Sequence, residues 1–134
     1  MKTASVYISE VKASIKEISV SELAVALSQP DIVLIDVRES EEYQHGHIPA
    51  SINYPRGLLE TKIRNHPLVA HFCEETDAIN ELAKMSIYLI CRTGGRSALA
   101  AKSLSDMGHN SVFSVTGGME EWNRRGLAIT TPKP

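Results

Sequence analysis

The sequence has few cysteines, no excess of positive charge and no long apolar run, and each shortage argues against a class of protein. Two cysteines in 134 residues do not suggest the disulfide framework of a small secreted domain. We therefore expect both to be reduced thiols in a cytoplasmic protein. The formal net charge of −2 argues against nucleic acid as a partner, because phosphate binding needs a concentrated basic face. No segment approaches the roughly 20 apolar residues of a membrane span, so we predict no membrane association.

What the chain does contain is enough apolar material for one core. Hydrophobic residues make up 43% of the sequence and charged residues 22%. We predict an N-terminal helix or a loosely attached leader at residues 1–17, one domain at 18–130 and a tail at 131–134. Ile8, Val11 and Ile15 follow one another at helical spacing, which favours the helix. Ser19 and Glu22 have the spacing of a capping box, which predicts that a second helix begins there.

Short β-branched and apolar runs alternate with helical patterns along the rest of the chain. Residues 32–37 are apolar on both faces, as in the central strand of a parallel sheet. Further strands are predicted at residues 48–55, 87–90 and 111–115. Helices are predicted at 57–65, 76–84, 97–107 and 118–125, with a short one opening at 38–43. This alternation indicates an α/β fold with a parallel sheet covered by helices on both faces. Ligands bind such sheets beyond the carboxyl ends of the strands, where Asp36 and Cys91 lie.

The apolar run at 87–90 leads directly into a short basic and glycine-rich stretch. Its residues are Cys91, Arg92, Thr93, Gly94, Gly95 and Arg96. A loop of this kind at a helix N-terminus points backbone N–H groups inward and favours an anion. The thiolate form of Cys91 would be stabilised there, which predicts a nucleophilic sulfur that meets an anionic substrate. The alternative is an inert buried thiol, but such a thiol needs no arginines beside it.

Four stretches together resemble the rhodanese family of sulfurtransferases. They are Asp36-Val37-Arg38-Glu39, Gly46-His47-Ile48-Pro49-Ala50-Ser51-Ile52-Asn53, the loop from Cys91 to Ser97, and Gly117-Gly118-Met119-Glu120-Glu121-Trp122. The resemblance covers roughly residues 18–128 and implies a mainly parallel five-stranded sheet. Two positions depart from the family's usual pattern. Ala50-Ser51 occupies the place of the common Gly-Ala pair. Thr116 precedes the two glycines, where many members have an apolar or acidic residue.

The resemblance also implies a chemistry. Cys91 would carry sulfane sulfur as a persulfide, taken from thiosulfate or a similar small anionic donor and passed to cyanide, a thiol or a protein acceptor. Arg92, Thr93, Gly94, Gly95 and Arg96 would cradle the persulfide and the donor. From their position at a strand end, we expect Asp36 and Arg38 to support the loop as an ion pair.

Two other functions stay open at this point. A sulfur relay or binding module for a partner protein would use the same residues. A cysteine-dependent phosphatase is disfavoured, because four residues separate Cys91 from Arg96 where phosphatases have five, and Ser97 stands at the phosphatase arginine position. We predict no cofactor and no metal. His45 with His47, and His71 with Cys73, have ligand-like spacing, but no further ligands complete a site.

Overall fold

All five strands of the sheet run parallel in the computed structural model, which describes residues 1–132. The order across the sheet is β1-β5-β4-β2-β3. The strands are β1 (Lys16–Ile18), β2 (Val33–Asp36), β3 (Ile52–Asn53), β4 (Ile87–Ile90) and β5 (Val112–Val115). The predicted α/β fold is confirmed, and the sheet is wholly rather than mainly parallel. The last two residues of the predicted tail at 131–134 lie outside the described residues.

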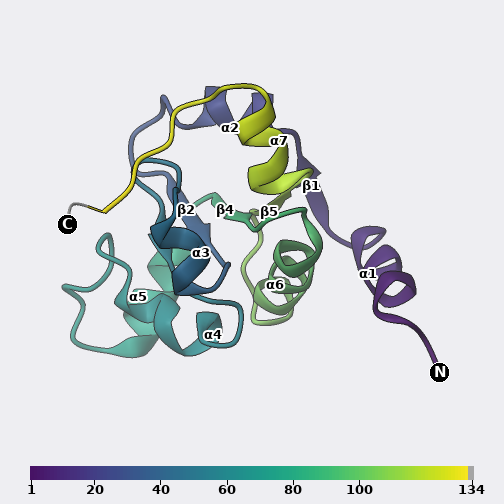
Figure 1. Ribbon diagram of the computed structural model, residues 1–134. Helices are drawn as coiled ribbons and strands as arrows, with labels where there is room; N and C mark the ends of the chain where they lie inside the picture. Colours follow the sequence, from purple (N-terminus) through teal and green to yellow (C-terminus); the bar gives the residue numbers. More distant parts are fainter. Residues whose placement is uncertain (133–134) are drawn as a thin grey trace.

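In the described part of the chain, seven α-helices and one short 3-10 helix connect and cover the strands (Figure 1). They are α1 (Ala4–Lys12), α2 (Val20–Ala26), α3 (Ser40–Gln44), α4 (Leu59–Lys62), η1 (Ile63–Asn65), α5 (Glu75–Leu82), α6 (Gly95–Asp106) and α7 (Gly118–Arg124). None of the helices within residues 1–132 is long and apolar enough to cross a membrane. The predicted capping box is present at the start of α2, where Ser19 and Glu22 exchange hydrogen bonds of 3.1 Å.

Alternate residues of the central strands serve two separate apolar layers. Ile35 faces a core built with α4, α5 and α6, and Leu34 faces a second core built with α2 and α7. All four residues of β2 are buried, which explains its apolar character on both faces. In Figure 1, α2 and α7 lie above the sheet, and α4, α5 and α6 lie below it. The sheet is thus covered on both faces, as predicted.

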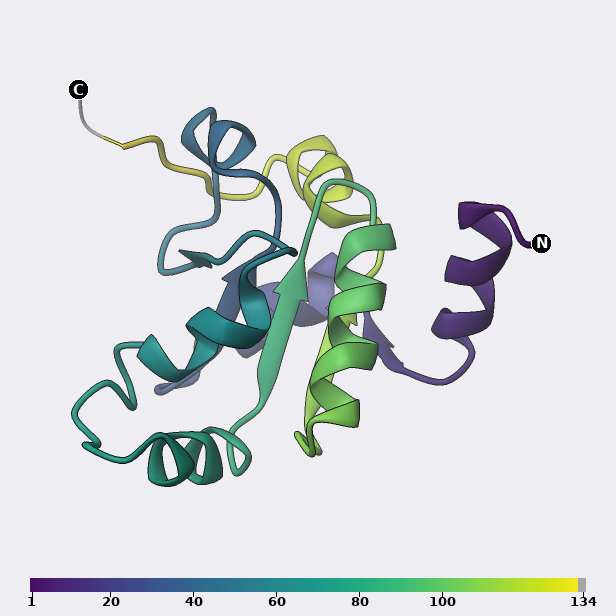
Figure 2. The same cartoon turned by 90° about the horizontal axis from the view of Figure 1, so that it is seen from below.

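The edge strand β1 has no counterpart among the strands predicted from residue patterns. Lys16 and Glu17 are exposed and Ile18 is half-buried, so no apolar run marks the strand. Backbone pairing with β5, in the register Lys16 with Phe113, defines it instead. The preceding helix ends at Lys12, so Ile15 lies beyond it. Consequently β1 spans the predicted boundary between residues 17 and 18. Figure 2 shows α1 on the outer side of α6, which in turn runs alongside the sheet.

A buried histidine makes the fold sensitive to acid. His109, between α6 and β5, is 3% exposed, and neither of its ring nitrogens has a hydrogen-bond partner among residues 1–132. Burial lowers the pKa of His109 below its ordinary value of 6.5. The His109 imidazole therefore takes up a proton more readily in the unfolded chain than in the folded chain. The contribution of neutral His109 to the free energy of unfolding is fully present above about pH 6.5 and is lost as the pH drops below that value.

We predict that His109→Leu reduces this acid sensitivity. The substitution removes two unpartnered buried nitrogens, so the free energy of unfolding should rise at neutral pH and rise further in acid. Urea unfolding at about pH 7.5 and about pH 5 should show a smaller difference in stability between the two conditions in His109→Leu than in the wild type. His71→Leu, which removes an exposed imidazole, should leave the gap as it is in the wild type. An unchanged gap in His109→Leu would contradict the prediction.

Candidate active site

The sulfur of Cys91 lies at the carboxyl end of β4, inside the turn that opens α6. Its Sγ accepts hydrogen bonds from the backbone N–H groups of Gly94, at 3.1 Å, and Ser97, at 3.3 Å. Gly94 has φ +109°, a conformation that glycine adopts without a Cβ clash. Cys91 is 1% exposed, yet its sulfur faces amides rather than apolar side chains alone. The arrangement favours negative charge on that atom.

Two buried hydroxyl groups, those of Ser97 and Ser114, lie in a row that ends at the Cys91 sulfur. Ser97 Oγ lies 3.5 Å from Cys91 Sγ and 2.8 Å from Ser114 Oγ. Both serines are fully buried. In the thiol form the S–H group donates to Ser97. In the thiolate form Ser97 donates to the sulfur, and Ser114 can donate to Ser97. Sequence reasoning did not assign a role to either serine. Ser114 points into the site from β5, a proximity that only the folded chain creates.

The N-terminus of α7 holds the loop from outside. The N–H groups of Met119 and Glu120 donate to the carbonyl oxygens of Cys91, at 2.8 Å, and Arg92, at 3.0 Å. Gly118 makes this approach possible. A Cβ on Gly118 would overlap the Cys91 carbonyl oxygen and lie 2.6 Å from that of Arg92. Gly118 is therefore needed for a close backbone contact with the Cys91 loop, a role that the sequence motif alone did not reveal.

Arg96 is held by a carboxylate. Its two terminal nitrogens donate to the two oxygens of Glu42 on α3, at 2.6 and 3.0 Å. This contact lowers the pKa of Glu42 from 4.5 to about 2. It also raises the pKa of Arg96, to which the nearby Cys91 adds a smaller contribution. The Arg96 guanidinium is thus close enough to Cys91 for their charges to interact. Its two terminal nitrogens, however, donate to Glu42 and are not free to bind an anion.

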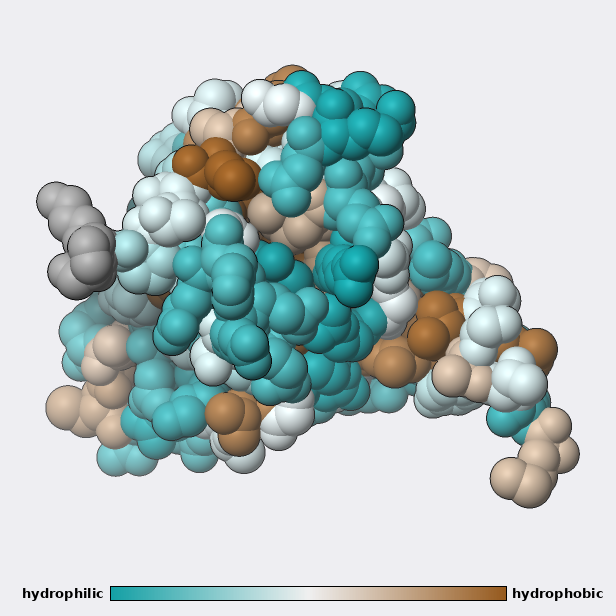
Figure 3. Space-filling view, viewed as in Figure 1, coloured by the Kyte–Doolittle hydropathy of each residue, from teal (hydrophilic) through white to brown (hydrophobic). Residues whose placement is uncertain are grey.

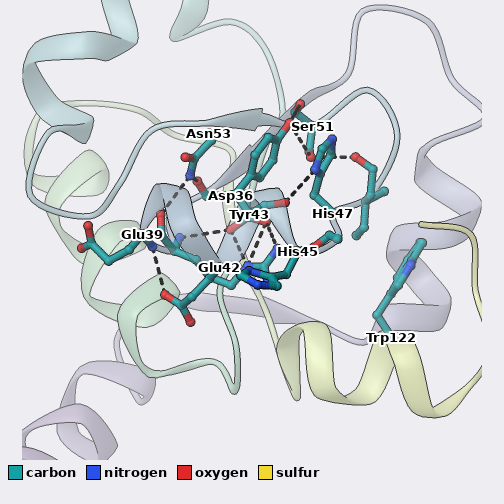
Figure 4. A network of polar contacts seen from close by, with 12 residues as sticks. Asp36, Glu39, Glu42, Tyr43, His45, His47, Ser51, Asn53 and Trp122 are labelled. Atoms are coloured by element: carbon teal, nitrogen blue, oxygen red, sulfur yellow. Dashed lines mark hydrogen bonds and ion pairs between the residues drawn. The ribbon is translucent and has the colours of Figure 1, made fainter. Parts of the chain in front are cut away.

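Asp36 and Arg38 form a buried ion pair, as expected from their position at the end of β2. Arg38 donates to the Asp36 carboxylate through its backbone N–H, at 3.0 Å, and through its guanidinium, at 2.8 Å. The guanidinium also donates to the carbonyl of Gly46 at 2.8 Å. Figure 4 shows the polar network around this pair, in which Asn53 donates to the carbonyls of Asp36 and Arg38. The pair ties the end of β2 to the segment after α3.

Arg92 and Thr93 lie at the surface, Gly95 is half-buried, and Arg92 lines a hollow beside the loop. Arg92 is exposed and pairs with Glu120 at 3.1 Å, and Thr93 is exposed as well. A hollow of about 310 Å³ beside the loop is lined by Arg38, Glu42, His45, Arg92, Met119, Glu120 and Asn123. Its rim carries both signs of charge, so it is not a purely cationic pocket.

None of the described residues form a cluster of three or more potential metal ligands. His47 instead stacks on Tyr43, with ring centroids 3.6 Å apart, and its Nδ1 lies 2.9 Å from the Tyr43 carbonyl. Figure 4 shows both rings beside Ser51. These contacts give His47 a structural role in the segment that follows α3.

This geometry agrees with comparisons against known proteins. Residues 19–125 match the model of the rhodanese-like domain, and the chain belongs to that family of sulfurtransferases. It is 34% identical over 115 residues to YrkF of Bacillus subtilis, which is provisionally named a sulfur carrier protein. That match covers 85% of this chain and 54% of YrkF. It is 35% identical over 92 residues to the adenylyltransferase and sulfurtransferase UBA4 of Meyerozyma guilliermondii, covering 69% of this chain and 20% of UBA4.

A solved structure extends the likeness to almost the whole chain. A Rhodopseudomonas palustris protein of unknown function, described as a possible tyrosine phosphatase, superimposes with a TM-score of 0.76 at 30% identity. The match covers 97% of this chain and 96% of that one. The chain spans about half the length of YrkF and a fifth of UBA4.

We predict that Gly118→Ala disrupts the loop. The new methyl group must push away the Cys91 and Arg92 carbonyls, in addition to adopting a φ of +54°. Gly126→Ala is the matched control, because Gly126 also has a positive φ, +69°, but open space around its Cβ position. Urea unfolding should show a loss of about 1 kcal/mol for Gly126→Ala and at least about 3 kcal/mol for Gly118→Ala. Equal losses in the two variants would contradict the close contact.

We predict that Ser114 acts on the sulfur through Ser97. The measurement is the pH profile of iodoacetamide alkylation of Cys91, in a Cys73→Ser background because Cys73 is exposed. Losing a hydroxyl donor to a thiolate should move the profile midpoint up by about 1 unit in Ser97→Ala, and by about a third of that in Ser114→Ala.

The double variant separates a hydroxyl chain from two independent effects. If Ser114 acts only through Ser97, the double variant should match Ser97→Ala alone, because the second hydroxyl has nothing left to polarise. Ser105→Ala, on the exposed face of α6, is the control. Additive shifts in the double variant would rule out the chain.

Proposed function

We propose that this chain transfers sulfane sulfur through a persulfide on Cys91. The observation that carries the proposal is the convergence of the Gly94 and Ser97 N–H groups on the Cys91 sulfur. Two fixed amide dipoles aimed at one atom stabilise charge on that atom without any reorganisation during the reaction. A buried structural thiol has no need of such donors.

In the first half of the reaction, the Cys91 thiolate attacks the outer sulfur of the donor. With thiosulfate as donor, a bond forms between the Cys91 sulfur and that outer sulfur. The S–S bond of thiosulfate breaks, and sulfite leaves with the electron pair. The protein is left as Cys91–S–S⁻. Thr93, Gly94 and Gly95 would line the space for the outer sulfur, and Arg92 would meet the anionic group of the donor.

In the second half, a nucleophile removes the outer sulfur. Cyanide or a thiolate attacks it, the S–S bond to Cys91 breaks, and the Cys91 thiolate is regenerated as thiocyanate or a new persulfide departs. No cofactor, metal or external oxidant is needed to balance either step. The two half-reactions share one covalent intermediate, so the kinetics should be of the double-displacement type.

Asp36, Arg38 and Arg96 would act as supports in this scheme. Arg38 is buried against Asp36, and Arg96 is bound bidentately by Glu42. Direct contact between Arg96 and the donor, as the sequence predicted, would require the guanidinium to share or leave Glu42. We therefore assign it first to holding α3 against the loop.

A relay from or to a protein partner is the second candidate. Two observations favour it. The arginines on the loop are compensated by Glu42 and Glu120, which weakens their attraction for a free dianion. Relatives such as YrkF and UBA4 carry additional sequence beyond the region matched here. In a relay, the donor would be a protein persulfide and the acceptor a protein thiol, with Cys91 as the carrier in both steps.

Phosphate ester hydrolysis is less well supported, although one structural neighbour is described as a possible phosphatase. A phosphoryl group needs a loop wide enough for a tetrahedron and an arginine that faces into it. Here Ser97 stands at the position of that arginine, and the preceding Arg96 points to Glu42. The amides converge on the cysteine sulfur itself.

The decisive experiment is sulfur loading followed by release. After incubation with thiosulfate, the intact mass of the wild type should rise by one sulfur atom, and cyanide should release that atom as thiocyanate. Cys91→Ser should show neither the gain nor the release, whereas Cys73→Ser should behave as the wild type does.

Two other results would redirect the assignment. No loading by thiosulfate, but rapid loading by a cysteine desulfurase, would favour the relay. No loading by either donor, together with Cys91-dependent hydrolysis of an aryl phosphate, would contradict sulfur transfer altogether.

A further inference from the structure

The three arginines near the catalytic loop are each compensated by a carboxylate. Arg38 pairs with Asp36 at 2.8 Å, Arg96 with Glu42 at 2.6 Å and Arg92 with Glu120 at 3.1 Å. Each pair contributes little net charge at the sulfur. The positive potential that the loop sequence suggests is therefore largely cancelled in the folded chain.

A fourth cation reaches the loop from the N-terminal helix. The Nζ of Lys12 lies 3.8 Å from the Cβ position of Gly94. Gly94 is also the residue whose N–H donates to Cys91 Sγ, at 3.1 Å. Standard backbone geometry then places the ammonium within about 10 Å of the sulfur. Lys12 is half-buried, and no carboxylate within residues 1–132 forms an ion pair with it.

The position of Lys12 is fixed by the packing of α1. Val11 is buried, and Ile8 Cδ1 lies 3.4 Å from the Cβ position of Gly95, the first residue of α6. Figure 3 shows apolar residues gathered over α1 where it leaves the body of the molecule. This helix precedes residues 19–125, the part of the chain that matches the family model. The contact is thus made by a segment outside the matched domain.

We propose that Lys12 is a positioning residue of this site, whose uncompensated charge stabilises the anionic forms of Cys91. The thiolate and the persulfide both place negative charge at the loop, and the ammonium approaches the same loop through Gly94. Lys12 touches neither donor nor acceptor and acts through space. The proposal rests on the proposed function in one respect, that Cys91 is the nucleophile.

A purely structural role is the competing explanation. Lys12 occupies the last turn of α1, where a cation stabilises the helix C-terminus, and its aliphatic stem contributes packing. Removing the charge while keeping the stem separates the two explanations. Lys12→Met does this, and Lys12→Arg restores the charge. Lys2→Met is the matched control, because it removes one positive charge from the same N-terminal segment, where Lys2 pairs with Glu10.

The experiment measures the alkylation rate of Cys91 against pH in a Cys73→Ser background. Lys12→Met should move the midpoint up by about half a unit, the effect of a unit charge near 10 Å at an intermediate effective dielectric. Lys12→Arg and Lys2→Met should keep the wild-type midpoint. The shift should shrink at about 1 M salt, where charges are screened. His45 and the three ion pairs at the site are common to all variants.

Two results would overturn the proposal. One is a wild-type midpoint in Lys12→Met with its melting temperature unchanged, which would show that the charge does not reach the sulfur. The other is an equal shift in Lys12→Met and Lys12→Arg accompanied by a lower melting temperature, which would assign Lys12 to structure. Failure of Cys91 to take sulfur from any donor would instead remove the proposed function while leaving the alkylation shift intact.

Discussion

The Gly94 and Ser97 amides converge on one sulfur atom, in a loop whose first two carbonyls are held by α7. Met119 and Glu120 donate to the carbonyls of Cys91 and Arg92. In a planar trans peptide the C=O and N–H groups point in opposite directions. Fixing those two carbonyls toward α7 therefore turns the N–H groups of Arg92 and Thr93 away from it. The start of the Cys91 loop is thus held by a helix that follows it by more than twenty residues.

Much of the fold follows from local patterns, whereas the site depends on distant contacts. The apolar run before Asp36 and the capping box at Ser19 each specify an element within a few residues. The edge strand β1 carries no such pattern, since only its backbone pairs with β5. The sequence likewise does not distinguish Ser114 from any other residue of a strand. Its hydroxyl is linked to the Cys91 sulfur only because the fold brings it within 2.8 Å of Ser97 Oγ.

The charges at the site likewise combine residues that a local pattern identifies with partners that only the fold brings near. Sequence reasoning places Arg92 and Arg96 on the loop, whereas Arg96 lies in the first turn of α6. It also assigns both arginines a positive potential that their carboxylate partners offset in the folded chain. Their partners Glu120 and Glu42 lie 28 and 54 residues away along the chain. No pattern within a short stretch of sequence links either arginine to its carboxylate partner. The potential near Cys91 therefore depends on backbone dipoles and on a cation from α1 more than on the neighbouring arginines.

A site built on dipoles favours a particular kind of substrate. Amide groups that converge within 3.1 to 3.3 Å of one sulfur stabilise charge confined to that atom. A tetrahedral dianion spreads its charge over several oxygens and needs an open, cationic pocket. Here the arginine forks are occupied by carboxylates, and the hollow beside the loop has a rim of mixed charge. Such a site suits an intermediate whose charge stays on sulfur, and it gives little advantage to a phosphoryl group.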